Sequence, residues 1–344
     1  MEINRKLLVD VSKEFIETAS PVSYYEEVFP LLERVMNEYG LKVWYDRKRT
    51  AYVTIEGEDN SKTVCVGAHL DTLGLIVRRI EPNGDLVIRQ LGGVNYSSME
   101  GASCEVITRD GKKYTGLVIC KSHSVHVFED ARTLPRDEDG ILVKLDELVE
   151  SEADVLALGI QHGDIVNVLP EFEYTSAGFI KSRYVDDKCA VGCMVAALDY
   201  LKKNDLKPKY KALMAFPVYE EIGHGGAYVP SEVEEYVAVD IGLIGPDYHG
   251  SEQKVSICAK DNFSPYDRGL TNKIIDLAKA NDLNYAVDVF FHYGTDANAA
   301  VRSGNNVYAA AFGMGCLASH GRERTHIKSL EETTKLLIAY LLAK

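Results

Sequence analysis

Apolar residues recur at helical spacing through the first forty positions of this chain and at strand spacing after them. Leu8, Val11 and Phe15 predict the buried face of one helix, and Pro21 separates it from a second helix. Short runs rich in β-branched and aromatic residues come next, bounded by polar turns, at 41–45, 51–55 and 63–68. These runs predict strands, and we expect the two helices to cover one face of their sheet.

The middle of the chain, from about 75 to 169, has a different pattern. Its apolar runs are short and alternate with polar residues, and turn signals such as Asp139-Gly140 recur between them. This pattern predicts a small, mainly β domain that is inserted into a larger one. We place the inserted domain at 73–172, and the larger domain at 1–72 and 173–344.

Helices and apolar strands alternate in the last part of the chain. Helices are predicted near 187–203, 272–281 and 329–343. Strands are predicted at 211–216, 236–239, 255–258 and 306–312. Such alternation is typical of an α/β fold with a mostly parallel sheet that helices cover on both faces.

Composition and charge limit the classes of function. The chain has 52 acidic and 38 basic residues, a formal net charge of −14 at pH 7, which disfavours nucleic acid and anionic membranes as partners. No run of about twenty apolar residues and no signal peptide is recognisable, so we expect a cytoplasmic protein. Seven cysteines, an odd number set mostly in apolar runs, predict buried reduced thiols instead of disulfides.

Histidine and acidic residues collect where the predicted strands end. The carboxyl ends of parallel strands meet at one edge of a sheet, where active sites form. The strand at 63–68 leads into His69 and then Asp71, a spacing that suits a metal ligand and a carboxylate that orients it. By itself, a histidine at a strand end can equally be an ordinary hydrogen-bonded residue.

More carboxylates follow the other strands. Glu220 and Glu221 come after one strand, where one could bind a metal while its neighbour takes a proton. Asp240 ends an otherwise apolar strand. Asp186 and Asp187 precede a helix, where one carboxylate could cap the amides and the other could face the site. Any one of these acids alone could be solvated, but together they favour a shared site.

The last candidate ligand is a histidine near the carboxyl end of the chain. His320 follows the last predicted strand, and its small neighbours Ser319 and Gly321 would let the backbone approach a crowded site. His326 is the competitor, but it follows a charged run that suits a surface. Histidines and acids without cysteines suit hard or borderline divalent ions, so this set predicts a hydrolytic metal centre.

The order of these motifs resembles that of the tetrahedral (TET) aminopeptidases, a metallopeptidase family that includes glutamyl and deblocking aminopeptidases. The resemblance covers essentially the whole chain and runs through Ala68-His69-Leu70-Asp71, the inserted β domain, Val185-Asp186-Asp187-Lys188, Glu220-Glu221-Ile222-Gly223, Val239-Asp240, Gly294-Thr295-Asp296-Ala297 and His320. It implies a zinc-exopeptidase-like sheet, an inserted barrel or PDZ-like domain for oligomerisation and access, and peptide substrates. It also implies a homo-oligomer, between a dimer and a dodecamer.

The same resemblance implies a ligand set for two divalent ions per subunit, zinc or cobalt. Asp186 would bridge the two ions. His69 and Asp240 would complete one site, and Glu221 and His320 would complete the other.

It further implies how the remaining site residues act. Glu220 would be the general base, and Asp71 would orient His69. His292 and Asp296 are expected in the substrate pocket. The resulting hypothesis is an aminopeptidase that hydrolyses the N-terminal residue from peptides.

Three other functions stay open at this point. A related sheet could carry an N-acyl amino acid deacylase or a carboxy-terminal exopeptidase. A non-catalytic scaffold could bind peptides through the β domain, although this chain keeps Glu220 and the candidate ligands. In that domain His123 and His126 alternate on a predicted strand, where they would line a surface or reach a neighbouring subunit.

Overall fold

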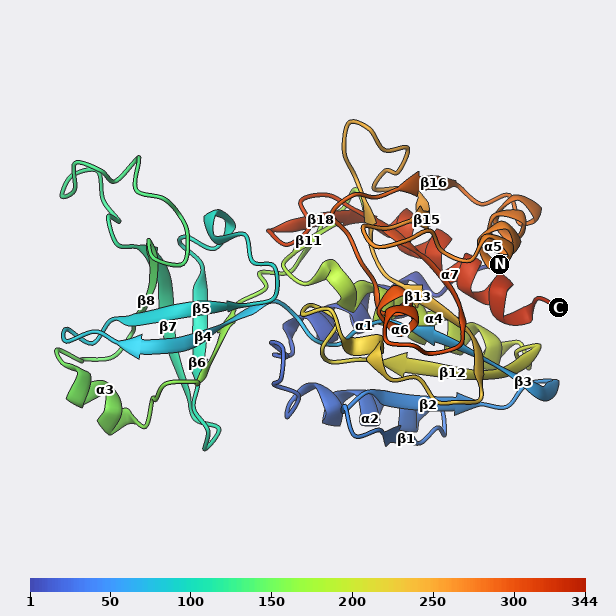
Figure 1. The fold of residues 1–344 in the computed structure, drawn as a ribbon, viewed down its shortest axis with the longest axis horizontal. Coiled ribbons are helices and arrows are strands. Elements are labelled where there is room, and N and C mark those ends of the chain that lie inside the picture. The colour runs from blue at the N-terminus through green and yellow to red at the C-terminus, as the bar shows by residue number, and fades with distance from the viewer.

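The computed structural model describes residues 1–344, and Figure 1 shows that they form two parts. The larger part is built on a nine-stranded sheet. Its strands lie in the order β1 (Val43–Tyr45), β2 (Ala51–Ile55), β12 (Tyr210–Phe216), β3 (Asp59–Gly67), β13 (Val233–Val239), β17 (Tyr308–Cys316), β15 (Val255–Lys260) and β16 (Tyr285–Val289), with β14 (Gly242–Leu243) paired to β17. The four central strands β12, β3, β13 and β17 are parallel to their neighbours in this group. The predicted α/β fold with a mostly parallel sheet is confirmed.

Helices cover both faces of this sheet. They are α1 (Arg5–Glu17), α2 (Val28–Glu38), α4 (Val185–Lys203), α5 (Arg268–Ala280), α6 (Asp296–Arg302) and α7 (Ile327–Leu342). On one face of the sheet, a cluster of 51 buried residues includes side chains of all these helices except α6. The other face belongs to a cluster of 15, to which α6 contributes Ala297 and Ala300. No helix has the length and hydropathy that a membrane span requires.

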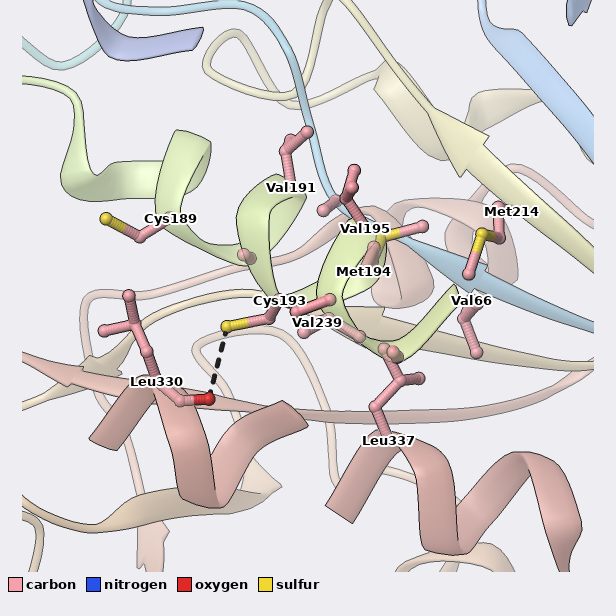
Figure 2. Packing of buried hydrophobic residues seen from close by; sticks show 14 of the residues in the cluster. Val66, Cys189, Val191, Cys193, Met194, Val195, Met214, Val239, Leu330 and Leu337 are labelled. Carbon is pink, nitrogen blue, oxygen red and sulfur yellow. Dashed lines mark hydrogen bonds between the residues drawn. The ribbon is translucent and has the colours of Figure 1, made fainter. Parts of the chain in front are cut away.

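Helix α4 is buried on almost every side. It packs on the sheet beside α7, and Figure 2 shows Met194 near Val66 and Val239 of the strands while Cys193 points toward Leu330 of α7. The Cys193 thiol donates a weak hydrogen bond to the Leu330 carbonyl oxygen, with sulfur and oxygen 3.5 Å apart (Figure 2). All seven cysteines are free and buried, as their apolar surroundings in the sequence predict.

The smaller part is a closed barrel with its own core. Its strands are β4 (Gly74–Ile80), β5 (Leu86–Leu91), β6 (Ser103–Ile107), β7 (Lys113–Cys120), β8 (Ile141–Leu145) and β9 (Ile165–Val168), with the short helix α3 (Glu152–Leu158) between the last two. Nineteen buried residues form a cluster separate from those of the large sheet. The chain enters and leaves the barrel side by side, because Leu75 pairs with Val166. The exact division at 73–172 stays a prediction.

Several features differ from the expected elements. His123 and His126 lie in the loop between β7 and β8 and not on a strand, and the Ser124 carbonyl accepts from the amides of residues 127 and 128 in a turn that includes His126. A small sheet of β10 (Glu173–Tyr174), β11 (Phe179–Ser182) and β18 (Glu323–His326) was not foreseen. Strand β17 continues past Phe312, since Gly313 packs so closely on Asp240 that a Cβ would lie 1.4 Å from the Asp240 carbonyl oxygen.

Candidate active site

The residues predicted to be functional collect at one edge of the large sheet. They are His69 after β3, Glu220 and Glu221 after β12, Asp240 after β13, His320 after β17, and Asp186 in the first turn of α4. The four strands are adjacent and parallel, so their carboxyl ends meet at this edge. The topology thus brings together side chains from segments far apart in the sequence.

Two groups of side chains offer metal-ligand atoms. The ligand atoms of His69, Asp186 and Glu221 all lie within 4.8 Å of one another, and so do those of His69, Asp187 and Asp240. The His69 Nε2 atom is 3.1 Å from the Asp186 Oδ1 atom. Because His69 belongs to both groups, the two groups form one continuous cluster.

His320 lies against this cluster. Its Nε2 atom lies 3.7 Å from Asp186 Oδ2 and 3.5 Å from Glu221 Oε2. Its Nδ1 lies 2.8 Å from the Gly93 carbonyl oxygen, and His69 Nδ1 lies 2.8 Å from the Asp71 carbonyl oxygen. A carbonyl oxygen only accepts, so both histidines donate through Nδ1 and turn Nε2 toward the acids, as metal-binding histidines do.

The electrostatics of the cluster fit a bound cation. Burial and the neighbouring Asp186 raise the pKa of Glu221 well above its ordinary value, and the same two causes raise the pKa of Asp240 to about 8. Burial lowers the pKa of His69, but Asp186 and other acids outweigh it and raise that pKa well above its usual range. A divalent ion among these side chains would relieve the repulsion between their carboxylates.

Asp187 faces the cluster and does not cap the helix. Asp186 and Asp187 have non-helical backbone angles, and neither side chain accepts from an amide of the helix that follows, so the capping expectation was wrong. Asp187 Oδ2 instead accepts from the His69 amide at 3.2 Å, while its buried Oδ1 atom has no partner. A buried carboxylate oxygen without a donor, in a set of imidazole and carboxylate groups, suits a hard or borderline divalent ion.

The Asp71 carboxylate contacts both His69 and the backbone of the Glu220-Glu221 segment. Its Oδ1 lies 3.6 Å from His69 Nδ1, and its two oxygens accept from the amides of Glu220 and Glu221, each at 3.1 Å. Asp71 therefore fixes the start of the loop that carries these two glutamates. Its predicted action on His69 stays a prediction.

Glu220 lies beside the cluster without belonging to either ligand group. Its Oε2 atom is 3.7 Å from His69 Nε2, and its side chain is 15% exposed. Burial, and after it Asp240 and Asp296, raise the pKa of Glu220 well above its ordinary value. The carboxylate is open to the same cavity as the ligands.

That cavity has a volume of about 470 Å³ and reaches from the cluster to the outer surface. Asp186, Glu220, Glu221, Asp240 and His320 are among its lining residues. Its other walls come from the loop that carries His292 and Tyr293, from Phe263, and from helix α6. His292 thus lies in the predicted pocket, although its contact with a substrate stays a prediction.

Asp296 lies behind the pocket wall. It is 5% exposed, does not line the cavity, and accepts from the Gly226 amide at 2.6 Å. Gly225 has to be glycine here, since a Cβ would lie 2.5 Å from the Asp296 carboxylate oxygens. Burial raises the pKa of Asp296 to about 7. Asp296 supports the loop that follows Glu221, and its predicted contact with substrate stays a prediction.

Comparison with known proteins assigns the family. The chain matches the model of the M42 glutamyl aminopeptidase family over residues 50–336. The chain belongs to this family. Protein YhfE of Bacillus subtilis (strain 168) is 37% identical over 334 residues, which cover 97% of this chain and 96% of that protein. This protein is accordingly a metallopeptidase of the aminopeptidase class. The predicted family and the predicted activity are confirmed.

Several solved structures share the fold of this chain. Aminopeptidase APDkam598 from the archaeon Desulfurococcus kamchatkensis has a TM-score of 0.88 at 22% identity, over 99% of this chain and 96% of that one. The TET1 peptidase of Pyrococcus horikoshii has a TM-score of 0.85 at 22% identity, over 98% of this chain and 100% of that one. It is described as assembling into a tetrahedron or a large octahedral shell.

Glu323 is a site residue that was not predicted from the sequence. It is 2% exposed, and its two carboxylate oxygens accept from the Asp186 amide at 3.0 Å and the His320 amide at 3.1 Å. It therefore fixes two candidate ligands at once. Its place between Arg322 and Arg324 is typical of a surface, so only its spacing of three from His320 could have pointed to it.

Lys188 is the second buried residue that was missed. Its ammonium donates to the Ser20 hydroxyl at 2.6 Å, which in turn donates to the Leu70 carbonyl oxygen at 2.6 Å. Burial lowers the pKa of Lys188 to about 7. These two hydrogen bonds connect α4 to the segment between His69 and Asp71.

Proposed function

We propose that this aminopeptidase removes the N-terminal residue of peptides with two divalent ions, zinc or cobalt, and with Glu220 as the general base. The observation that carries the proposal is the joined pair of ligand groups around His69, with Glu220 beside them and in neither. Asp186 would bridge the ions. His69 and Asp240 would complete one site, with Asp187 close by, and Glu221 and His320 would complete the other.

The residues of the chain divide the chemistry between them. Bound ions would supply Lewis-acid activation of water and of the substrate carbonyl. Glu220 would take the proton of the attacking water and hand it to the leaving amine, because its carboxylate is free of the ligand groups. The carboxylates that line the cavity would attract the positively charged α-amino group of the substrate. This attraction supports removal of the first residue over cleavage inside a peptide.

Matched peptides with free and acetylated amino ends test this function. The metal-loaded protein is expected to release the first residue from the free peptide and to leave the acetylated one intact. Mass spectrometry of the products checks both. Release of acetate would favour a deacylase, release of the last residue a carboxy-terminal exopeptidase, and cleavage of neither peptide a binding scaffold.

The two histidines near the carboxyl end give a sharper test of the ligand set. His326 lies outside the cluster, where its Nδ1 accepts from the Lys328 amide at 3.1 Å and its Nε2 lies 2.9 Å from the Ala177 carbonyl oxygen. Loss of a ligand should weaken one metal site by about 10-fold or more, since even outer contacts are worth about 10–100-fold.

We therefore expect His320→Ala to lower metal content to about one ion per chain, and His326→Ala to leave about two. Atomic emission on dialysed protein measures this, and circular dichroism confirms that both variants are folded. The reverse pattern would move the ligand assignment to His326.

The barrel, predicted as the inserted domain 73–172, is proposed to serve assembly and access. None of the candidate ligands lies in it, although its Gly93 carbonyl contacts His320. Apolar side chains are exposed on it, among them Val125 at 54% and Val127 at 69% in the loop between β7 and β8. The shell described for the P. horikoshii TET1 peptidase supports a homo-oligomer here as well. The cytoplasmic location stays a prediction.

Shortening this loop tests the assembly role without disturbing Gly93. Cys120 pairs directly with Ile141, so a two-residue Asn-Gly turn can replace residues 121–140. We expect a smaller mass per particle in light scattering and an unchanged metal content. Leu206→Ala, which removes an exposed apolar side chain from the larger part of the protein, is the control. An unchanged mass in the shortened protein would contradict assembly through this loop.

A further inference from the structure

Arg302 is a charged residue of the cavity that has no hydrogen-bond or ion-pair partner within the protein. It ends helix α6 and lines the same cavity as the acidic cluster. Its guanidinium carbon lies 3.7 Å from the centroid of the Phe263 ring, so the group stacks on an aromatic face. It forms no hydrogen bond and no ion pair with another side chain. Stacking holds the plane of the guanidinium and leaves the N–H groups at its edge free.

The lining of the cavity therefore carries both signs of charge. Carboxylates of Asp186, Glu220, Glu221 and Asp240 line the cavity, whereas Arg302 is the only lysine or arginine among its lining residues. Apolar side chains such as Leu243 and Phe263 form the wall as well. A peptide substrate offers the matching pattern when it carries a carboxylate in addition to its α-amino group.

An unpaired arginine on a surface is usually only solvated, and such a residue contributes little to binding. Arg302 differs because its group is planar, stacked and part of the lining of the same cavity as the candidate catalytic residues. A guanidinium binds carboxylates through two parallel N–H bonds, which a flat, pre-oriented group forms at a smaller loss of entropy. Peptides contain no other common anion.

We propose that Arg302 binds a carboxylate of the peptide substrate and so determines which peptides are preferred. The carboxylate has two possible sources: the side chain of an acidic N-terminal residue, or the free carboxyl end of a short peptide. This inference rests on the proposed aminopeptidase function, and it assigns to Arg302 a role in specificity and not in the chemical step.

Two pairs of substrates separate these sources. The first pair is the anilides of glutamate and glutamine, which differ only in the side-chain carboxylate. The second is Leu-Gly and Leu-Gly amide, which differ only at the carboxyl end. The ratio of kcat/KM within each pair is measured for the native protein, Arg302→Met, Arg302→Lys and a control, Arg268→Met. Arg268 is exposed at the start of α5 and does not line the cavity, so its loss removes the same charge elsewhere.

Arg302→Met is expected to lower one of the two ratios about tenfold, mainly through KM, which is the size of one charge-assisted contact. The affected pair identifies the source of the carboxylate. Arg302→Lys should keep part of the ratio, and Arg268→Met should keep all of it. The proposal would be overturned if Arg302→Met left both kcat/KM ratios unchanged. This holds even if kcat/KM fell equally on all four substrates. Failure of the native, metal-loaded protein on all four substrates would instead refute the proposed aminopeptidase function.

Discussion

Glu220→Gln is expected to lower kcat by about 10²–10⁴-fold, the typical contribution of a positioned general base. The amide keeps the size of the side chain and its capacity to accept a hydrogen bond, but it cannot take a proton at neutral pH. Glu220 lies outside both ligand groups, so the loss should appear without a loss of metal. KM should change much less than kcat, because the interaction is made in the transition state.

Steady-state kinetics on an aminoacyl anilide and metal analysis of the same preparations check this result. Glu129→Gln is a matched control, since Glu129 is an exposed glutamate in the loop between β7 and β8. The control should keep native activity. If Glu220→Gln kept native activity as well, another residue would have to be the base. If it lost its metal, Glu220 would have to be counted among the ligands.

Removal of metal by a chelator should abolish activity, and zinc or cobalt should restore it at about two ions per chain. Without cations the cluster holds several buried carboxylates at short range, and burial together with Asp186 raises the pKa of Asp240 to about 8. Protons then compete with metal for these oxygens. Metal affinity is therefore expected to rise with pH up to about the pKa of Asp240, and metal binding below it should release protons.

Isothermal titration of the metal-free protein at pH 6 and pH 8 measures both effects. Chelator already saturated with zinc is the control, because it has the same ionic composition and removes no metal. Full activity in protein shown to be metal-free would contradict the two-metal proposal. A stoichiometry of one ion per chain would leave the family assignment intact and reduce the ligand set.

Much of the fold could be predicted because its signals are local. Hydrophobic spacing identified α1, α2 and most strands of the large sheet to within a few residues, since a residue's neighbours in sequence decide which face is apolar. The parallel sheet then implied that His69, Glu220 and Asp240 would meet, because strand ends converge at one edge. Strand β16 was missed: it is a short strand of five residues at the edge of the sheet, and only pairing with β15 defines it.

Other features depend on residues that the sequence separates widely. One of Asp186 and Asp187 was expected to cap a helix, but Asp187 accepts a hydrogen bond from His69, 118 residues away. Glu323 looked like a surface charge, but it binds the Asp186 amide across 137 residues. The glycines after Phe312 looked like a loop, but they allow a strand to pack against Asp240.

The sequence by itself determined the fold class, the family and the residues that gather at the edge of the sheet, because strand periodicity and ordered motifs are written along the chain. Only the tertiary structure decided which oxygen faces which nitrogen. It placed His320 in the cluster and His326 outside it, buried Glu323 between two ligands, and left Arg302 unpaired in the cavity. Burial and partners of a polar side chain are set by what packs against it, and that depends on contacts between distant segments.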